Sequence, residues 1–259
     1  MTWLENMTWL IPAIVVPLVG LCIYVPLRIK GRMQPALIVK CILSVGFILY
    51  ALVAGFRVAS IDAVEPWVFL IVLFTLAGMV FSLLGDVWLD LKDMVLEYQR
   101  FFMFCGFSSF MIGHLFFIFG MGMAYRLPRW VWPMALLVGA LIAGANLLVE
   151  KPFKLHYGDY RNILVAYAFV IGVATAIPII YAIRLSGQPG HSLQPAIFAA
   201  GMVLFLLSDL VLSQIYFAEP EVASKPILFV LNYLFYFGAQ YLLALSLYFL
   251  PYAGLPGSA

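Results

Sequence analysis

The chain contains one motif twice, as GMVFSLLGDVWL at residues 78–89 and as GMVLFLLSDLVL at residues 201–212. Seven of the twelve positions are identical, and each copy carries one aspartate, Asp86 or Asp209, in an otherwise apolar run. A charged side chain at the centre of a membrane helix costs about 2.5 to 3.5 kcal/mol on insertion scales, so it marks a functional site by default. Two acids at matched positions predict one shared site.

The composition around these stretches is that of a membrane protein. The chain is 65% hydrophobic and 10% charged, and its mean hydropathy of +1.07 lies far outside the range of soluble domains. Each apolar run is close to the roughly 20 residues that cross a bilayer. We therefore predict an all-α integral membrane protein with eight transmembrane helices near residues 9–27, 35–56, 66–89, 101–123, 130–148, 163–183, 193–217 and 226–250.

The loops between these runs are too short to hold a soluble domain, so residues 1–259 are expected to form a single membrane domain. The repeated stretches fall in the third and seventh runs, which are four crossings apart and therefore run in the same direction. The two halves would then be parallel four-helix repeats. Chance similarity within an apolar alphabet is the alternative explanation.

The basic residues predict an orientation. Short cytoplasmic loops are enriched in Lys and Arg, and the odd-numbered loops hold nine of them against four in the even-numbered loops. This bias puts both termini outside and opens the site to the cytoplasmic half of the membrane. The net charge of +2 is small and scattered, which argues against a nucleic-acid partner.

Other polar residues are expected at the depth of the two aspartates. Lys40 lies about one turn into the second helix, and His114 lies near the middle of the fourth. Three residues of the eighth helix share a face at i, i+4 and i+8 spacing. Asp90 follows Asp86 by one turn and is a candidate third acid, whereas Asp93 and Glu97 farther along the same stripe are expected in solvent. The predicted pocket contains Asp86 and Asp209 with Lys40, Asp90, His114, Asn232, Tyr236 and Gln240.

Each of the accompanying residues also has a purely structural interpretation. Asn232 and Gln240 fit hydrogen bonds between helices. Lys40 is as suited to reach the lipid headgroups as to pair with an aspartate. A single intramembrane histidine such as His114 is more often a packing residue than a ligand.

The inventory favours acid–base chemistry over metal or nucleophilic chemistry. Zinc needs several nitrogen, sulfur or carboxylate ligands at one point, and the other two histidines lie in loops of opposite predicted sidedness. The sequence contains no Gly-rich phosphate loop and no G-x-S-x-G elbow. We therefore expect no metal and no soluble cofactor.

Four segments resemble the YhhN-type lysoplasmalogenase family of eight-helix membrane proteins. They are FSLLGDVWL in the third helix, SSFMIGHLFFI in the fourth, GMVLFLLSDLVLS in the seventh and YFGAQYLLALS in the eighth. In this family a tyrosine usually follows the fourth-helix histidine by three residues, and Phe117 takes its place here.

The resemblance implies an ether-bond hydrolase that cleaves the vinyl ether of lysoplasmalogens to a fatty aldehyde and glycerophosphocholine or glycerophosphoethanolamine. Its partner would be a lysophospholipid within the bilayer. Asp86 and Asp209 would be the catalytic pair, one as general acid and the other as the counter-charge that activates water. Lys40, His114, Asn232, Tyr236, Gln240 and Asp90 would bind or orient the substrate.

Two rival functions fit the same aspartates. Parallel repeats with intramembrane acids also describe proton-coupled transporters of a lipid or small solute. A scaffold in which the aspartates only bond across helices is the third possibility, and it predicts that isosteric Asn replacements leave function intact.

Overall fold

The computed structural model describes residues 3–59, 66–125, 127–186 and 192–250. These residues form helices and no strand. The long helices are α1 (Trp3–Ile29), α2 (Met33–Ala59), α3 (Pro66–Leu91), α4 (Gln99–Ala124), α5 (Val131–Glu150), α6 (Arg161–Leu185), α7 (Gln194–Phe217) and α9 (Pro226–Ser246). Short helical turns are η1 (Leu96–Tyr98), η2 (Gly158–Tyr160), α8 (Pro220–Ala223) and η3 (Leu247–Phe249).

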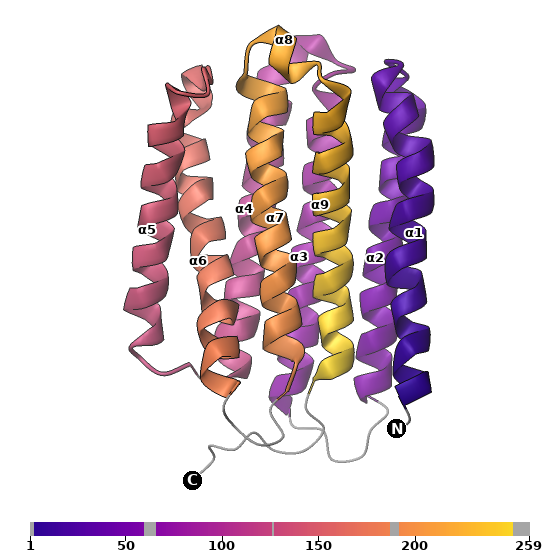
Figure 1. Ribbon diagram of the computed structural model, residues 1–259, viewed down its shortest axis with the longest axis vertical. Helices are drawn as coiled ribbons and strands as arrows, with labels where there is room; N and C mark the ends of the chain where they lie inside the picture. The colour runs from indigo at the N-terminus through magenta and orange to yellow at the C-terminus, as the bar shows by residue number, and fades with distance from the viewer. Residues whose placement is uncertain (1–2, 60–65, 126, 187–191, 251–259) are drawn as a thin grey trace.

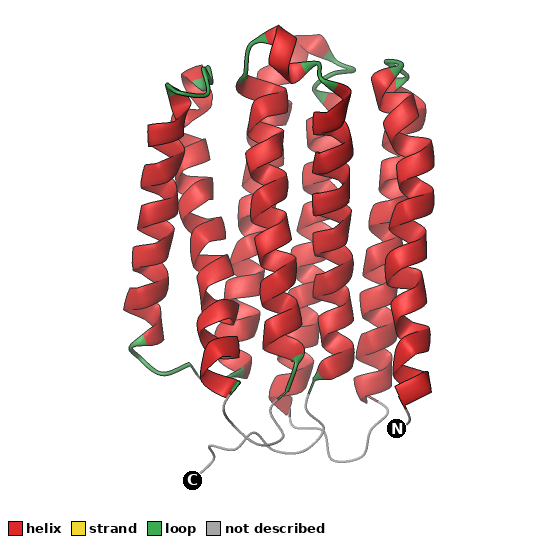
Figure 2. Cartoon of the chain, viewed as in Figure 1, coloured by secondary structure: helices red, strands yellow, loops and turns green. Residues whose placement is uncertain are grey.

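Eight of these helices are long and apolar enough to cross a membrane, which confirms the predicted fold class. They stand side by side as an up-and-down bundle (Figures 1 and 2). Prolines mark several starts, because Pro66 opens α3 and Pro226 opens α9, where a missing N–H costs no helical hydrogen bond. Gly31, at a φ of +68°, allows the tight turn between α1 and α2.

The two repeated stretches lie on helices that run in the same direction. Both α3 and α7 start at the lower end of the bundle in Figure 1, where α1 begins and α9 ends, and both finish at the opposite end. We call that opposite end the upper end; it carries the turns after α1, α3, α5 and α7. Asp86 lies five residues before the end of α3 and Asp209 eight residues before the end of α7. Both acids therefore lie in the upper half of the bundle.

The repeated glycine serves a similar purpose in both copies. A Cβ at Gly78 of α3 would fall into the Phe117 ring of α4. A Cβ at Gly201 of α7 would lie 3.0 Å from the Leu243 side chain and 3.2 Å from the Ala239 carbonyl of α9. Small residues allow such close helix contacts in membrane bundles. The repeat thus makes two closely packed pairs, α3 with α4 and α7 with α9.

Helix α5 has a different environment from the rest. Among the described elements, α6 packs broadly against α4, α5 and α7, whereas α5 packs broadly against α6 alone. Helices α5 and α7 therefore flank α6 (Figure 1). Residues of all three helices line a groove between α5 and α7, with α6 as its floor.

Candidate functional site

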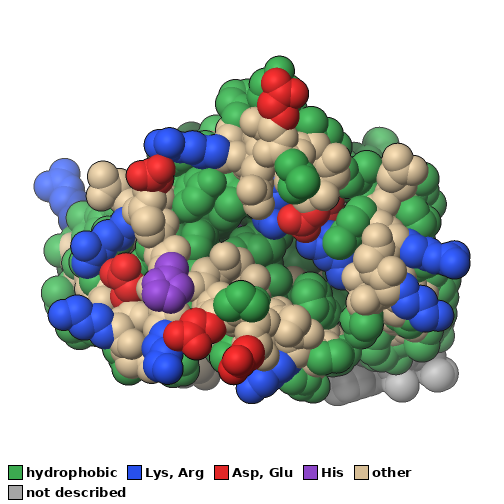
Figure 3. Space-filling view, turned by 90° about the horizontal axis from the view of Figure 1, so that it is seen from above, with side chains coloured by type: hydrophobic (Ala, Val, Ile, Leu, Met, Phe, Trp, Pro, Cys, Tyr) green, Lys and Arg blue, Asp and Glu red, His purple; other side chains and the backbone are tan. Residues whose placement is uncertain are grey.

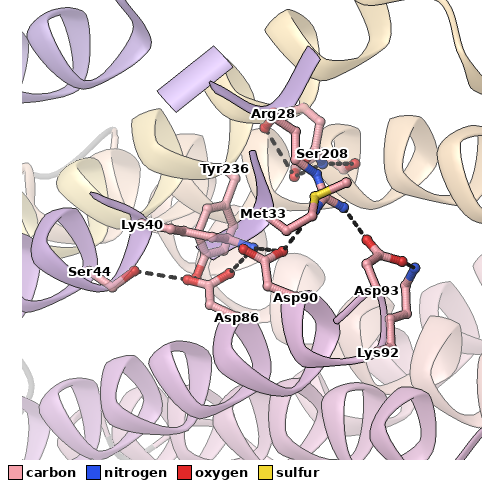
Figure 4. A network of polar contacts seen from close by, with 11 residues as sticks. Arg28, Met33, Lys40, Ser44, Asp86, Asp90, Lys92, Asp93, Ser208 and Tyr236 are labelled. Atoms are coloured by element: carbon pink, nitrogen blue, oxygen red, sulfur yellow. Dashed lines mark hydrogen bonds and ion pairs between the residues drawn. The ribbon is translucent and has the colours of Figure 1, made fainter. Parts of the chain in front are cut away.

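Asp86 of α3 has three polar partners. It is 2% exposed, and its Oδ2 accepts hydrogen bonds from Ser44 of α2 at 2.9 Å and Tyr236 of α9 at 2.7 Å. Its Oδ1 lies 3.1 Å from the Lys40 ammonium. Figure 4 shows these three partners converging on the carboxylate from α2 and α9. A buried carboxylate with a cation and two hydroxyl donors is compensated in its ionised form.

Lys40 pairs with aspartates, so of its two interpretations the ion pair is the one observed. Besides Asp86, its ammonium contacts Asp90 Oδ1 at 3.4 Å. Asp90 is 2% exposed and also lies 4.0 Å from the Arg28 guanidinium of α1. Asp90 Oδ2 is buried without a hydrogen-bond partner among the described residues.

The acidic stripe continues into a charge cluster instead of open solvent. Asp93 was expected to be solvated, but it forms ion pairs with Arg28 and Lys92 (Figure 4). Although burial alone would raise the pKa of the Asp93 carboxyl, the adjacent Lys92 ammonium and Arg28 guanidinium outweigh it and lower that pKa. The expectation failed because Arg28 belongs to α1, and nothing in the sequence indicates that its side chain reaches the turn after α3. Glu97 is exposed as expected.

Asp209 occupies the opposite kind of environment. Its Oδ2 accepts one hydrogen bond, from the Tyr167 hydroxyl of α6 at 2.6 Å. No Lys, Arg or His of the described chain forms an ion pair with it. A carboxyl group in apolar surroundings without a cation is better accommodated neutral than charged.

A small polar cavity joins the two aspartates. Its volume is about 30 Å³, which is room for about two water molecules at the roughly 10–15 Å³ that one water needs. Its polar lining comes from Tyr24, Arg28, Lys40, Asp86, Asp90, Ser208, Asp209, Tyr216, Asn232, Tyr233 and Tyr236. The structure thus brings the two aspartates of the repeat to one polar cavity, together with four of the six other predicted site residues.

A larger apolar cavity occupies the groove between α5 and α7. Its volume is about 200 Å³, and α6 contributes Leu164, Tyr167 and Ile171 to its lining. Asp209 lies in its wall as well as in the wall of the polar cavity. Ala145 of α5 and Leu210 of α7 line it and are exposed, so the cavity opens on the lipid-facing surface of the bundle. Seen from the upper end, charged side chains surround an apolar hollow (Figure 3).

Two further predicted site residues, Asn232 and Gln240, belong to α9. Asn232 donates to the Ser208 carbonyl at 3.1 Å and to the Ser208 hydroxyl at 3.0 Å, so it joins α9 to α7. Asn232 also lines the polar cavity. Gln240 is fully buried and lines neither cavity; both of its amide atoms lack a hydrogen-bond partner within the described chain.

His114 packs against Tyr167, the residue that donates to Asp209. Its Nδ1 contacts the Phe110 carbonyl at 2.7 Å, and its ring meets the Tyr167 ring edge to face at 5.5 Å. Its Nε2 is buried without a partner in the described part of the chain. His114 therefore supports the tyrosine that donates to Asp209 and does not contact the acid itself.

Sequence reasoning missed Ser44, Tyr167 and Arg28. Ser44 stands one turn after Lys40, so the face of α2 that carries Lys40 could have pointed to it. Tyr167 is one of 14 tyrosines and carries no distinguishing pattern. Within the described residues, no group of three or more His, Cys, Asp or Glu side chains could hold a metal ion.

Comparison with known proteins gives one match. The model of the YhhN family matches residues 35–247, a range that contains both aspartates and every helix from α3 to α9. No curated protein and no solved structure matches the chain. The match covers well over half of the sequence, and the chain belongs to the YhhN family.

Proposed function

We propose that the protein is a lysoplasmalogenase, which hydrolyses the vinyl ether of a membrane lysophospholipid with Asp209 as general acid and Asp86 as base. One observation carries the proposal: Asp209 borders both an apolar cavity open to lipid and a polar, water-sized cavity that it shares with Asp86. The apolar cavity suits an alkenyl chain, and the polar cavity suits the attacking water. Membership of the YhhN family supports the same reaction.

The surroundings of the two acids support a division of labour. Asp209 has a tyrosine donor and no ion pair among the described residues, so it is the better holder of a proton. Asp86 is held as a carboxylate by Lys40, Ser44 and Tyr236. Paired titratable groups whose environments differ in this way take opposite acid–base roles.

The reaction begins with transfer of the Asp209 proton to the β-carbon of the vinyl ether. This step leaves an oxocarbenium cation, which the Asp209 and Asp86 carboxylates stabilise. Water from the polar cavity then attacks the carbon bonded to the ether oxygen, while Asp86 accepts a proton from that water.

The resulting hemiacetal collapses with a second pair of proton transfers. Asp86 returns its proton to the departing glycerol oxygen, and the hemiacetal hydroxyl gives its proton to Asp209. The products are a fatty aldehyde and the glycerophospho-alcohol, and both aspartates regain their starting states. The net reaction consumes one water and needs no cofactor.

The direct test uses the purified full chain in detergent with a 1-alkenyl-2-hydroxy glycerophosphocholine or glycerophosphoethanolamine. We expect a fatty aldehyde that, in D₂O, carries one deuterium at the carbon next to the carbonyl, because the acid delivers its proton there. Well-folded protein that releases no aldehyde would refute the proposal, as would aldehyde without deuterium. Transport of the intact lipid across proteoliposomes without cleavage would favour the transporter instead.

A further inference from the structure

The apolar cavity has a polar corner that the proposed chemistry does not use. Asn146 of α5 and Tyr157, in the turn after α5, both line it. Tyr157 is 1% exposed, and its hydroxyl has no hydrogen-bond partner within the described chain. The Asn146 Oδ1 is likewise buried and unpartnered there. Buried polar atoms are rarely left unsatisfied, so two in one corner call for a ligand.

The two unpartnered atoms have complementary chemistry. Asn146 Oδ1 can only accept a hydrogen bond. Burial raises the pKa of the Tyr157 hydroxyl, and the Glu150 carboxylate raises it further, so this group remains a donor at neutral pH. The neighbouring Asn146 side chain lowers this pKa in part, which makes the two groups close neighbours. A single ligand hydroxyl in the cavity that reaches both would donate to Asn146 and accept from Tyr157.

The polar corner lies between the upper end of the bundle and the depth of Asp209. Asn146 is four residues before the end of α5, and Asp209 is eight residues before the end of α7. At about 1.5 Å per residue, these positions lie about 6 and 12 Å below the upper helix ends. A lipid with its headgroup at the upper end and its chain in the cavity would present its glycerol to the corner before its ether bond reaches Asp209.

We propose that Asn146 and Tyr157 recognise the free glycerol hydroxyl next to the ether-linked chain, and so select one-chain lysolipids over two-chain lipids. The inference rests on the proposed function for the identity of the lipid. An ester or ether oxygen at that position can accept from Tyr157 but cannot donate to Asn146, which would stay unpaired. Sites built around a substrate hydroxyl reject analogues that lack it far more strongly than apolar pockets reject an extra group.

The size of the cavity supports the same selection. A dry cavity of about 150 Å³ holds one benzene, so a cavity of about 200 Å³ has room for a segment of one hydrocarbon chain. A second chain on the neighbouring glycerol carbon would have to displace the polar corner.

The test measures binding, so that it does not depend on catalysis. Two non-cleavable lipids are compared on the purified full chain in nanodiscs: a 1-O-alkyl-2-hydroxy glycerophosphocholine and its 2-O-methyl ether. Affinities are obtained by displacement of a fluorescent-tailed lysophosphatidylcholine. We expect the wild type to prefer the hydroxyl form about tenfold or more. Asn146→Leu should weaken binding of the hydroxyl form about tenfold and leave the methyl ether unchanged, so that the preference disappears. Tyr157→Phe should weaken binding of both lipids, because the hydroxyl and the ether oxygen each accept from Tyr157.

Matched controls come from the same end of the molecule. Asn162→Leu and Tyr98→Phe make the same changes at exposed residues that line neither cavity, and they should keep the wild-type preference. Tyr157→Phe removes a single oxygen, and its thermal unfolding is compared with wild type to confirm that it folds.

Three results would overturn the inference: no binding of the hydroxyl lipid, no preference in the wild type, or, in the folded variants, an unchanged preference in Asn146→Leu or an unchanged affinity in Tyr157→Phe. A missing preference would mean that water alone bridges the corner. The aldehyde assay separates this inference from the proposed reaction. A hydroxyl preference that Asn146→Leu abolishes, in protein that releases no aldehyde, would preserve the recognition site and refute the hydrolase.

Discussion

The two aspartates of the repeated motif come from nearly the same sequence but have different neighbours. Asp86 faces α2 and α9, which supply Lys40, Ser44 and Tyr236. Asp209 faces α6, which supplies one tyrosine hydroxyl. The difference arises from the neighbouring helices, because the motif itself is shared. A duplicated acid thereby becomes two chemically distinct groups, one compensated as an anion and one suited to carry a proton.

The largest effect is expected from the two isosteric replacements. Asp209→Asn should lower aldehyde release by about 10²- to 10⁴-fold, the usual contribution of a general acid. Its stability should change by no more than about 1 kcal/mol, because the Asn carbonyl still accepts from Tyr167.

Asp86→Asn should lower activity too, but here stability falls with it, since the buried Lys40 loses a partner. The loss should stay below the about 3 to 5 kcal/mol typical of a broken buried pair, because Asp90 remains 3.4 Å from Lys40. Turnover and thermal unfolding in detergent test both variants. Equal stability losses in the two variants would contradict the difference between the environments of Asp86 and Asp209. Near-normal turnover in either variant would exclude the paired mechanism.

A smaller effect is expected when Asp209 loses its donor. Tyr167→Phe leaves the half-buried Asp209 without its hydrogen bond, which costs about 1–3 kcal/mol. We expect turnover to fall about tenfold, which corresponds to 1.4 kcal/mol in the barrier. Tyr241→Phe is the matched control, because its hydroxyl has no partner among the described residues and it lines neither cavity. If both replacements had the same effect on turnover, Tyr167 would have no special link to Asp209.

The repeated glycines Gly78 and Gly201 compare how closely the two copies of the motif pack against their partner helices. An alanine Cβ at Gly78 collides with the Phe117 ring, whereas at Gly201 the nearest atoms of Leu243 lie 3.0 Å away. Gly78→Ala should therefore destabilise by about 1–3 kcal/mol, as overpacked sites do, and Gly201→Ala by less. Unfolding midpoints of the two variants measure this difference. The reverse order would mean that α7 and α9 adjust to each other less than α3 and α4 do.

The smallest effect is expected on the stability of the folded protein at acidic pH, through Asp93 near Asp86. The pKa of Asp93 is lowered in the folded protein by Lys92 and Arg28, against the effect of burial. Its stabilising contribution is therefore present above the ordinary aspartate pKa of about 3.9 and is lost as pH falls through the lower folded value. Asp93→Asn should flatten the fall in unfolding temperature over this acidic range. Asp159→Asn, at an exposed ion pair with Arg100, is the control and should change the profile little.

The sequence predicted the bundle and the depth of the acids for simple physical reasons. Eight apolar runs of membrane length leave few alternatives, and four crossings between Asp86 and Asp209 put them in the same half. What it left open was the lateral arrangement of the helices. From its place in the sequence, Lys40 is equally suited to reach the lipid headgroups or to pair with an aspartate. The packing of α2 against α3 brings it to Asp86.

The remaining features depend on helix neighbours that carry no pattern. Tyr167 and Tyr157 look like other tyrosines of an aromatic-rich chain, and only the packing of α6 against α5 and α7 brings them to one cavity. Asn232 had two interpretations as well, and its bonds to Ser208 reveal a link between α7 and α9. Pairwise packing of apolar helices is decided by shape, which composition and spacing do not encode.

The groove between α5 and α7 has a consequence for how such a protein would be measured. Because the cavity opens toward lipid, its occupancy depends on the mole fraction of substrate among surrounding lipids and not on its molar concentration in the buffer. Adding inert detergent or lipid at constant substrate should slow the reaction as though substrate had been removed. Apparent Michaelis constants would then be properties of a surface, comparable only between preparations of the same membrane composition.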